Sequence, residues 1–242
     1  MNNINNISVC LTPEQFHNYE NKNAIVVVID LLRATSVIST AFENGIKKII
    51  PVTSINEALK YKNKENHILA AERNTKPVSG FDFGNSPYNY INNDVNNKIL
   101  VLTTTNGTKA IHTAKGHDII TASYINIEAI TNYLINKQRD IIILCSGWKN
   151  LINIEDTLFA GHLSKLLIEK KIFQSNCDSL FIAKKLFETK NTDMFSFLSN
   201  SAYRKRNQNK DFLNDTKFCL NPNITSNIIP MYSNGELIAF KK

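Results

Sequence analysis

Short runs of apolar residues alternate with longer segments of mixed polarity through the first 170 residues. Two runs, Ile25–Ile29 and Ile141–Cys145, are apolar throughout, a pattern typical of central strands that are covered on both faces. The pattern predicts strands at Ala24–Ile29, Lys48–Val52, His67–Ala71, Ile99–Thr103, His117–Ala122 and Asp140–Cys145. Helix-length segments separate them, so we expect a three-layer α/β/α fold with a mostly parallel or mixed central sheet.

Helix boundaries are marked in several of the intervening segments. The hydroxyls of Thr35–Ser36 are placed to cap a helix that ends at Gly45. The spacing within Ser54–Glu57 is that of a capping box, in which each end residue's side chain accepts from the other's backbone N–H. Ser86–Pro87 predicts a further helix start, with a serine cap and a first-turn proline.

The chain becomes irregular and more helical after residue 170, then closes with the apolar runs Ile228–Tyr232 and Glu236–Phe240. Asn234–Gly235 lies between these runs and predicts a C-terminal β-hairpin. No linker rich in glycine, serine or proline divides the chain. We therefore expect a single domain over residues 1–242, with an α/β core over 1–170 and an irregular, helical segment with a terminal hairpin over 171–242.

The charge balance adds little to this picture. Lysine and arginine number 28 against 21 for aspartate and glutamate, a net charge of +7. Proteins that bind nucleic acids usually cluster basic residues among aromatic ones, whereas the only dense basic run here, Arg204–Arg206, lies in a polar stretch typical of a solvated loop. Most of the excess is lysine, which we attribute to compositional drift, so no nucleic-acid partner is expected.

Composition also indicates the cellular compartment in which the protein is expected. No apolar run approaches the roughly 18 residues of a membrane span, and residues 1–6 lack the basic and apolar regions of a secretion signal. The four cysteines are far apart and form no Cys-x-x-Cys pair, which argues against a zinc site or a disulfide framework. We expect a cytoplasmic protein with reduced thiols and no membrane partner.

Four polar turns after predicted strands carry the candidate chemistry, because ligands of open α/β sheets bind at the carboxyl ends of the strands. In the first turn, Asp30 directly follows a strand and Arg33 offers a planar cation for phosphate or carboxylate oxygens. Thr35 and Ser36 bring hydroxyls and free N–H groups to a helix start, where anions are favoured. A structural interpretation is also open, in which Asp30 pairs with Arg33 and Thr35 only caps the helix.

The second turn places Glu72 and Arg73 after the third predicted strand. A long loop with two glycines and two aromatic residues follows, and it contains Asp82 and, at its end, Asn85 and Ser86. The length of this loop favours a ligand-binding function. Ordinary turn chemistry also explains Asp and Asn beside glycine.

The third turn contains four threonines, an asparagine and a glycine within six residues and opens a helix. Consecutive N–H groups and hydroxyls can hold an oxyanion without adding charge. The alternative is a β-rich threonine run that ends in a turn. The candidate residues here are Thr104, Thr105, Asn106, Gly107 and Thr108.

The fourth turn joins Cys145–Ser146 to Glu155 and Asp156 at the next helix start. These paired carboxylates either complement the helix dipole or reach the crevice as metal ligands. The five histidines show no zinc-site spacing, and a site rich in carboxylates and poor in histidine favours Mg²⁺ over zinc. No Walker A sequence and no Gly-x-Gly-x-x-Gly is present, so NTPase and dinucleotide-binding functions lose their main support.

Four motifs, in this order, resemble the 2-phosphosulfolactate phosphatase family over about residues 24–165. They are Asp30-Leu-Leu-Arg-Ala-Thr-Ser36, Gly80-Phe-Asp-Phe-Gly-Asn-Ser-Pro87, Thr103-Thr-Thr-Asn-Gly-Thr108 and Glu155-Asp-Thr-Leu-Phe-Ala-Gly161. The resemblance implies a magnesium-dependent phosphohydrolase that converts 2-phosphosulfolactate to 3-sulfolactate and phosphate, a step toward coenzyme M. Two stretches depart from the family pattern. Trp148–Ile152 stands where a glycine-containing turn is typical, and Ser201–Tyr203 replaces a Ser-x-His.

The turns and the resemblance together give a set of expected roles on a small anionic phosphoester substrate. We expect the catalytic residues to be Asp30, Arg33, Glu72 and Asp82. We expect the Mg²⁺ ligands to be Asp30, Asp82, Glu155 and Asp156. The expected substrate- and phosphate-binding residues are Thr35, Ser36, Arg73, Asn85, Ser86, Thr104, Thr105, Asn106, Gly107, Thr108, Cys145 and Ser146.

Several alternatives stay open at this point. The attacking group is either a metal-activated water or Asp30 itself, which would form an aspartyl-phosphate. The substrate is 2-phosphosulfolactate or another phosphorylated hydroxy acid or sugar acid. A non-catalytic anion-binding module that keeps the fold is a further alternative, motivated by the Tyr203 departure. A homodimer is expected only because it is common among soluble enzymes.

Overall fold

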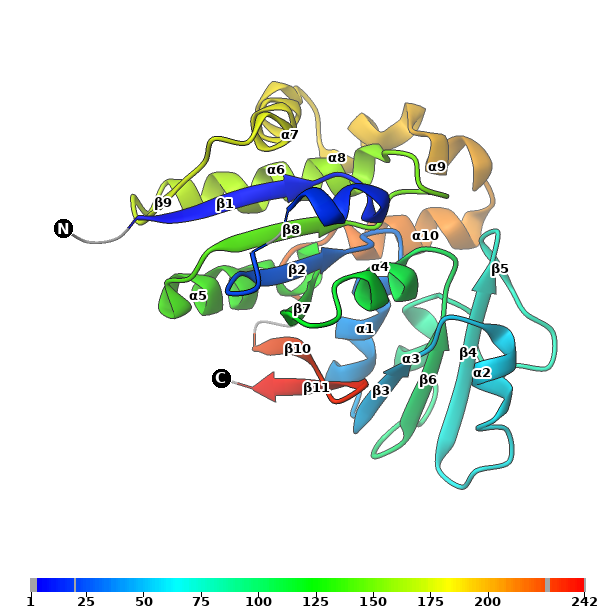
Figure 1. Cartoon of the computed structure of the whole chain (residues 1–242). Helices are drawn as coiled ribbons and strands as arrows, with labels where there is room; N and C mark the ends of the chain where they lie inside the picture. The colour runs from blue at the N-terminus through cyan, green and yellow to red at the C-terminus, as the bar shows by residue number, and fades with distance from the viewer. Residues whose placement is uncertain (1–3, 20, 225–226, 242) are drawn as a thin grey trace.

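The computed structural model describes residues 4–19, 21–224 and 227–241. Residues 1–3, part of the segment expected to lack a secretion signal, lie outside the described residues. The described strands form one mixed sheet in the order β5-β4-β6-β3-β11-β10-β7-β2-β8-β1-β9 (Figure 1). They are β1 Asn5–Cys10, β2 Ile25–Ile29, β3 Lys48–Pro51, β4 His67–Arg73, β5 Lys76–Pro77, β6 Ile99–Thr103, β7 Asp118–Ala122, β8 Ile141–Cys145, β9 Phe173–Gln174, β10 Ile228–Ser233 and β11 Glu236–Lys241.

Helices connect these strands and fill most of the C-terminal segment (Figure 1). The α-helices are α1 Ala34–Glu43, α2 Ile55–Leu59, α3 Tyr88–Ile91, α4 Gly107–Thr113, α5 Ile127–Lys137, α6 Ile154–Ile168, α7 Asp178–Thr189, α8 Met194–Phe197, α9 Ala202–Arg206 and α10 Lys210–Cys219. Short 3₁₀ helices occupy Pro13–Asn18, Tyr124–Asn126 and Leu198–Asn200. None of the helices in the described part of the chain has the length and apolarity needed to span a bilayer.

The sheet is covered on both faces, which confirms the expected three-layer arrangement. β2 illustrates this, because alternate residues of a strand point to opposite faces. Val26 and Val28 pack into a core with α1 and α4. Val27 and Ile29 pack into a second core with α5 and α6. Every residue of this strand is therefore withdrawn from water, as its unbroken apolar sequence predicts.

The C-terminal hairpin lies in the middle of the sheet. β10 pairs antiparallel with β7, and β11 pairs antiparallel with β3. On one side of the hairpin, β3, β6 and β4 are parallel; on the other, β7, β2, β8 and β1 are parallel. The predicted hairpin is confirmed, but it joins two parallel halves and is not a peripheral addition, so the last residues of the chain complete the sheet.

The six predicted interior strands are present, with ends that differ from the prediction by at most two residues. β1 was not predicted, because its alternating Ile7 and Val9 lie in an asparagine-rich segment of low overall hydrophobicity. The capping box at Ser54 and Glu57 is confirmed. Two predicted caps are wrong. α1 has Arg33 at its N-cap and α3 has Pro87, neither with a side-chain capping hydrogen bond.

Candidate active site

Polar ends of strands from both halves of the sheet meet at one place. Asp30 directly follows β2, Glu72 lies near the end of β4, and the turn after β6 lies between them. Glu72 accepts hydrogen bonds from the hydroxyl of Thr105 at 3.2 Å and from its N–H at 3.4 Å. The turn then brings Gly107 against Asp30, where a Cβ on Gly107 would lie 2.7 Å from Asp30 Oδ2. This turn therefore joins acidic residues that belong to separate parts of the sheet.

Asp30 is the centre of the acidic cluster and is only 8% exposed. Its Oδ1 accepts a hydrogen bond from the N–H of Ala34 at 3.3 Å, and no described residue donates one to Oδ2. Burial raises the pKa of Asp30 well above its ordinary value, and the charges of Asp156, Glu72 and Glu155 raise it further. These surroundings therefore favour the neutral form of the Asp30 carboxyl group.

Asp156 is a fully hydrogen-bonded carboxylate that links three segments. Its Oδ1 accepts from the N–H of Leu31 at 2.8 Å. Its Oδ2 accepts from the hydroxyl of Ser146 at 2.9 Å, the amide of Asn153 at 3.0 Å and the N–H of Gly147 at 3.2 Å. Burial still raises the pKa of Asp156 to about 6, because withdrawal from water outweighs these four donors. Both oxygens are occupied, so Asp156 fixes the loops around Asp30.

Glu155 precedes Asp156 in the first turn of α6 and is 3% exposed. No other described residue donates a hydrogen bond to its carboxylate. Burial, and then the charge of Asp156, raise its pKa to about 7, although Arg206 favours the charged form. Among the described residues, no group of three or more His, Cys, Asp or Glu side chains is arranged to hold a metal ion. Glu155 and Asp30 are thus the buried carboxylates with oxygens left for a further ligand.

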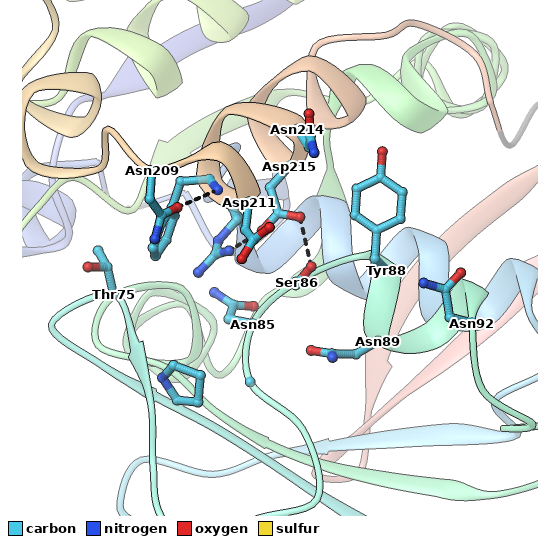
Figure 2. Close-up of a pocket in the computed structure, with 14 residues that line it drawn as sticks. Thr75, Asn85, Ser86, Tyr88, Asn89, Asn92, Asn209, Asp211, Asn214 and Asp215 are labelled. Atoms are coloured by element: carbon cyan, nitrogen blue, oxygen red, sulfur yellow. Dashed lines mark hydrogen bonds and ion pairs between the residues drawn. The ribbon is translucent and has the colours of Figure 1, made fainter.

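The C-terminal segment holds the side chain of Arg33 in place. Its guanidinium pairs with the carboxylate of Asp215 in α10 and lies 4.5 Å from the ring centre of Phe212. Figure 2 shows Asp215 facing Ser86, whose hydroxyl donates to the second Asp215 oxygen at 2.7 Å. Arg33 and Asp215 are both buried. The loop before α3, the start of α1 and α10 are therefore tied together around one buried ion pair.

Two hollows adjoin at Arg33. We call the narrow one the crevice, and it is lined by Asp30, Leu32, Arg33, Glu72, Thr75, Asn85, Asn106, Trp148 and Tyr203. The other is a larger cavity of about 560 Å³ along α10, with several asparagine amides and the carboxylates of Asp211 and Asp215 in its wall (Figure 2). Arg33, Thr75 and Asn85 line both. Asn85 is buried, and its Oδ1 has no hydrogen-bond partner in the described part of the chain.

Asp82 does not join the cluster, contrary to the expected catalytic and metal-binding roles. It is exposed, and its Oδ2 accepts from the N–H of Leu69 at 2.8 Å in the middle of β4. The loop turns back along this strand, which places Asp82 in a separate hollow beside His67, at the opposite end of β4 from Glu72. We therefore leave Asp82 out of the site.

The hydroxyls at the start of α1 already form hydrogen bonds within the protein. Thr35 Oγ1 donates to the carbonyl of Asp30 at 3.0 Å and accepts from the Asp30 N–H at 3.2 Å. Ser36 Oγ donates to the carbonyl of Leu31 at 2.9 Å. Thr35 and Ser36 therefore hold the backbone on which Asp30 is mounted, and they do not face the crevice.

Other predicted phosphate-binding groups are engaged in the same way. Thr104 and Thr108 exchange hydrogen bonds with each other's backbone. Burial raises the pKa of Cys145 well above its ordinary value, so this group stays a thiol. The guanidinium of Arg73 donates to the hydroxyl of Thr103 at 2.8 Å and to two backbone carbonyls. Of the predicted binding residues, Asn85 and Asn106 line the crevice itself.

Sequence patterns missed the groups contributed by the C-terminal segment. Asp215 and Phe212 lie in α10, about 180 positions from the arginine that they hold. Tyr203 of α9 lines the crevice, although in the sequence it stands out only as a departure from a family pattern. Trp148 also lines it, with Arg206 stacked 4.2 Å from its ring centre. Helical periodicity alone does not indicate which distant strand end a helix will cover.

Comparison with known proteins extends over nearly the whole structure. A family model described as 2-phosphosulpholactate phosphatase matches residues 10–235, a range that includes strands from both halves of the sheet, α9 and α10. A "Probable 2-phosphosulfolactate phosphatase" of Thermotoga petrophila is 38% identical over 212 residues, 88% of this chain and 90% of that protein. A protein of the same name from Clostridium acetobutylicum is 34% identical over 236 residues, 96% of this chain and 99% of the relative. The chain therefore belongs to the 2-phosphosulpholactate phosphatase family.

Proposed function

We propose that this chain is a Mg²⁺-dependent phosphatase that hydrolyses 2-phosphosulfolactate to 3-sulfolactate and phosphate. The observation that carries the proposal is the buried carboxylate of Asp30, which faces the crevice beside Arg33 and among further carboxylates. Carboxylates for a cation and an arginine for phosphate oxygens are the groups that phosphoryl transfer needs. The family and the names of the relatives support the substrate.

The chemistry of the acidic cluster fits Mg²⁺. This ion takes oxygen ligands, commonly one or two protein carboxylates together with waters and phosphate oxygens. Asp30 and Glu155 have oxygens that no other described side chain engages, so we assign them as the protein ligands. Glu72 and Asp156 add charge around them and keep their own hydrogen bonds. When bound, the cation would polarise the phosphoryl group and lower the pKa of a coordinated water.

Arg33 is prepared to bind the phosphoryl group. Asp215 and Phe212 fix the plane of its guanidinium, and the N–H groups that Asp215 leaves free can donate to phosphate oxygens. Asn106 supports the same ligand, because the N–H of Lys149 donates to its Oδ1 at 3.0 Å and leaves its NH₂ group available. A charged fork and a neutral donor thus line the crevice beside Asp30.

The attacking group is the next question for experiment. A water held in the crevice gives phosphate directly, whereas attack by Asp30 gives an aspartyl-phosphate that water then hydrolyses. Acid quench during turnover, followed by mass spectrometry of the peptide that contains Asp30, distinguishes the two. A phosphate adduct on this peptide supports the covalent route; its absence in a reaction that releases phosphate supports attack by water.

Phosphate release from 2-phosphosulfolactate tests the function. The purified protein should release phosphate with Mg²⁺ and stop with EDTA, and Asp30→Asn should lower turnover by at least ~100-fold, since even residues that only support a metal ligand contribute 10–100-fold. Asp82→Asn is the matched control and should keep full activity, because Asp82 lies outside the cluster. A protein that binds phosphate but never releases it from an ester would instead be an anion-binding module.

A second candidate substrate is favoured by the larger cavity. Its walls present amides and two carboxylates, and its one arginine is already neutralised by Asp215. Such walls suit hydroxyl groups better than a second strong anion, so a phosphorylated hydroxy acid or sugar acid is the alternative. A panel of phosphate esters with Mg²⁺ decides between them, and turnover of sugar-acid phosphates without turnover of 2-phosphosulfolactate would overturn the first proposal.

A further inference from the structure

Tyr203 lines the crevice and carries a hydroxyl that the fold does not use. The residue lies in α9, is 2% exposed and lines the crevice together with Asp30 and Arg33. Its hydroxyl has no hydrogen-bond partner among the described residues. A buried hydroxyl without a partner is costly, so its presence beside a polar crevice indicates a group that acquires a partner when a ligand binds.

The surroundings of Tyr203 determine the role open to it. Charged or ionisable groups from several elements act on it, namely Arg33 before α1, Asp215 and Cys219 of α10, and Glu155 of α6. Burial raises the pKa of Tyr203, with the carboxylates adding to the shift and Arg33 opposing it. The phenol therefore stays protonated at neutral pH and can donate, without adding charge, to an acidic ligand.

We propose that the Tyr203 hydroxyl donates a hydrogen bond to an oxygen of the phosphoryl group bound in the crevice. The inference deepens the proposed function and rests on it for the identity of the bound group. Arg33 would donate through the N–H groups that Asp215 leaves free, and Tyr203 would add a neutral donor from a different helix. A donor at this position assists most where negative charge grows on the phosphoryl oxygens during the reaction.

Tyr203→Phe tests this role, because it removes one oxygen atom and keeps the ring that fills the core. The metal-free variant should melt no lower than the parent, since the lost hydroxyl has no partner in the protein. Its kcat/KM should fall by about 10- to 100-fold, the loss expected for one hydrogen bond to a charged group. Inorganic phosphate, followed by thermal shift, should bind correspondingly more weakly.

Tyr124→Phe is the matched control. Tyr124 is also fully buried with an unpartnered hydroxyl, but it packs against Phe159 and His162 and lines neither hollow. This variant should keep the melting temperature, the phosphate affinity and the activity of the parent. A matching loss of activity in both variants would overturn the inference, since it would report a general effect of removing buried hydroxyls.

The two readouts separate this inference from the proposed function. If Tyr203→Phe turns over substrate and binds phosphate as the parent does, the inference is wrong and the phosphatase assignment stands. If the parent releases no phosphate from any ester but loses phosphate binding on Tyr203→Phe, the function is wrong and the inference stands. A lower melting temperature of the metal-free variant would show that the hydroxyl serves the fold, and would also overturn the inference.

Discussion

Gly107 is the point where the turn after β6 touches the acidic residue after β2. A Cβ at this position would lie 2.6 Å from the Cβ of Ala34 and 2.7 Å from Oδ2 of Asp30. Cβ atoms essentially never come within 3.0 Å of such neighbours, and the Ala34 atom is carried directly by the backbone of α1. Gly107→Ala must therefore move the start of α4 away from the segment that carries Asp30, and we expect it to impair catalysis more than folding.

The expected stability change is small because two effects oppose each other. Overpacking by one methyl group in a filled site costs about 1–3 kcal/mol. Replacing glycine by alanine within a helix returns about 1 kcal/mol, so the net loss is about 0–2 kcal/mol. The expected catalytic change is larger, since a displacement of about 1 Å in a site of this kind costs about 100-fold in rate.

Urea unfolding and phosphate release, measured on the same preparations, check this prediction. Gly116→Ala is the control, because Gly116 has a left-handed φ of +95° and open space around its Cβ position. That substitution should cost about 1–2 kcal/mol through backbone strain alone and leave kcat/KM unchanged. Full activity in a folded Gly107→Ala protein would refute the reasoning, because the contact with Asp30 would then not matter for the reaction.

Asp215→Ala leaves the buried Arg33 without its partner and should lower the free energy of unfolding, measured in urea, by about 3–5 kcal/mol. Glu14→Ala, which removes an exposed ion pair with Lys109, should lower it by less than ~1 kcal/mol. Equal losses in the two variants would contradict this prediction. In EDTA, the melting temperature should fall from pH 5 to pH 8. Burial raises the pKa of Glu155 to about 7 and of Asp156 to about 6. The folded protein therefore binds protons more tightly than the unfolded chain, and the stability that this binding adds is lost as pH rises through these values. Calorimetry should show Glu155→Gln or added Mg²⁺ flattening this dependence; an unchanged slope in both would contradict it.

The layers of the fold were predictable because they follow from local patterns. Apolar runs such as Ile25–Ile29 can only be buried on both faces, and Asn234–Gly235 dictates a tight turn between neighbouring strands. The position of the hairpin between β7 and β3 was not predictable in the same way. The pairing of strands depends on how the whole chain packs. The residues of the hairpin itself are as compatible with the edge of a sheet as with its centre.

The position of a candidate residue was predictable where that residue lies at a strand end. Asp30 and Glu72 are examples, because the strand fixes where their side chains begin. The sequence predicts that Thr35 binds phosphate, but its hydroxyl is hydrogen-bonded to the backbone of Asp30. Asp82 lies away from the acidic cluster for a different reason, since a loop of its length can turn toward either end of β4. Hydroxyl groups and loop residues form hydrogen bonds with the nearby backbone as readily as with a ligand. The sequence alone does not tell which of the two partners they have.

The charge around the crevice argues for a divalent cation in the proposed reaction. The protein as a whole carries +7, yet Asp30, Glu72, Glu155 and Asp156 are all buried at this point, and Asp215 neutralises Arg33. A phosphate monoester is itself anionic and would be repelled by those carboxylates of the cluster that are ionised. A bound Mg²⁺ would reverse the sign of the field where the phosphoryl oxygens must lie. On this proposal, the local acidity, and not the net charge of +7, sets what the site can bind.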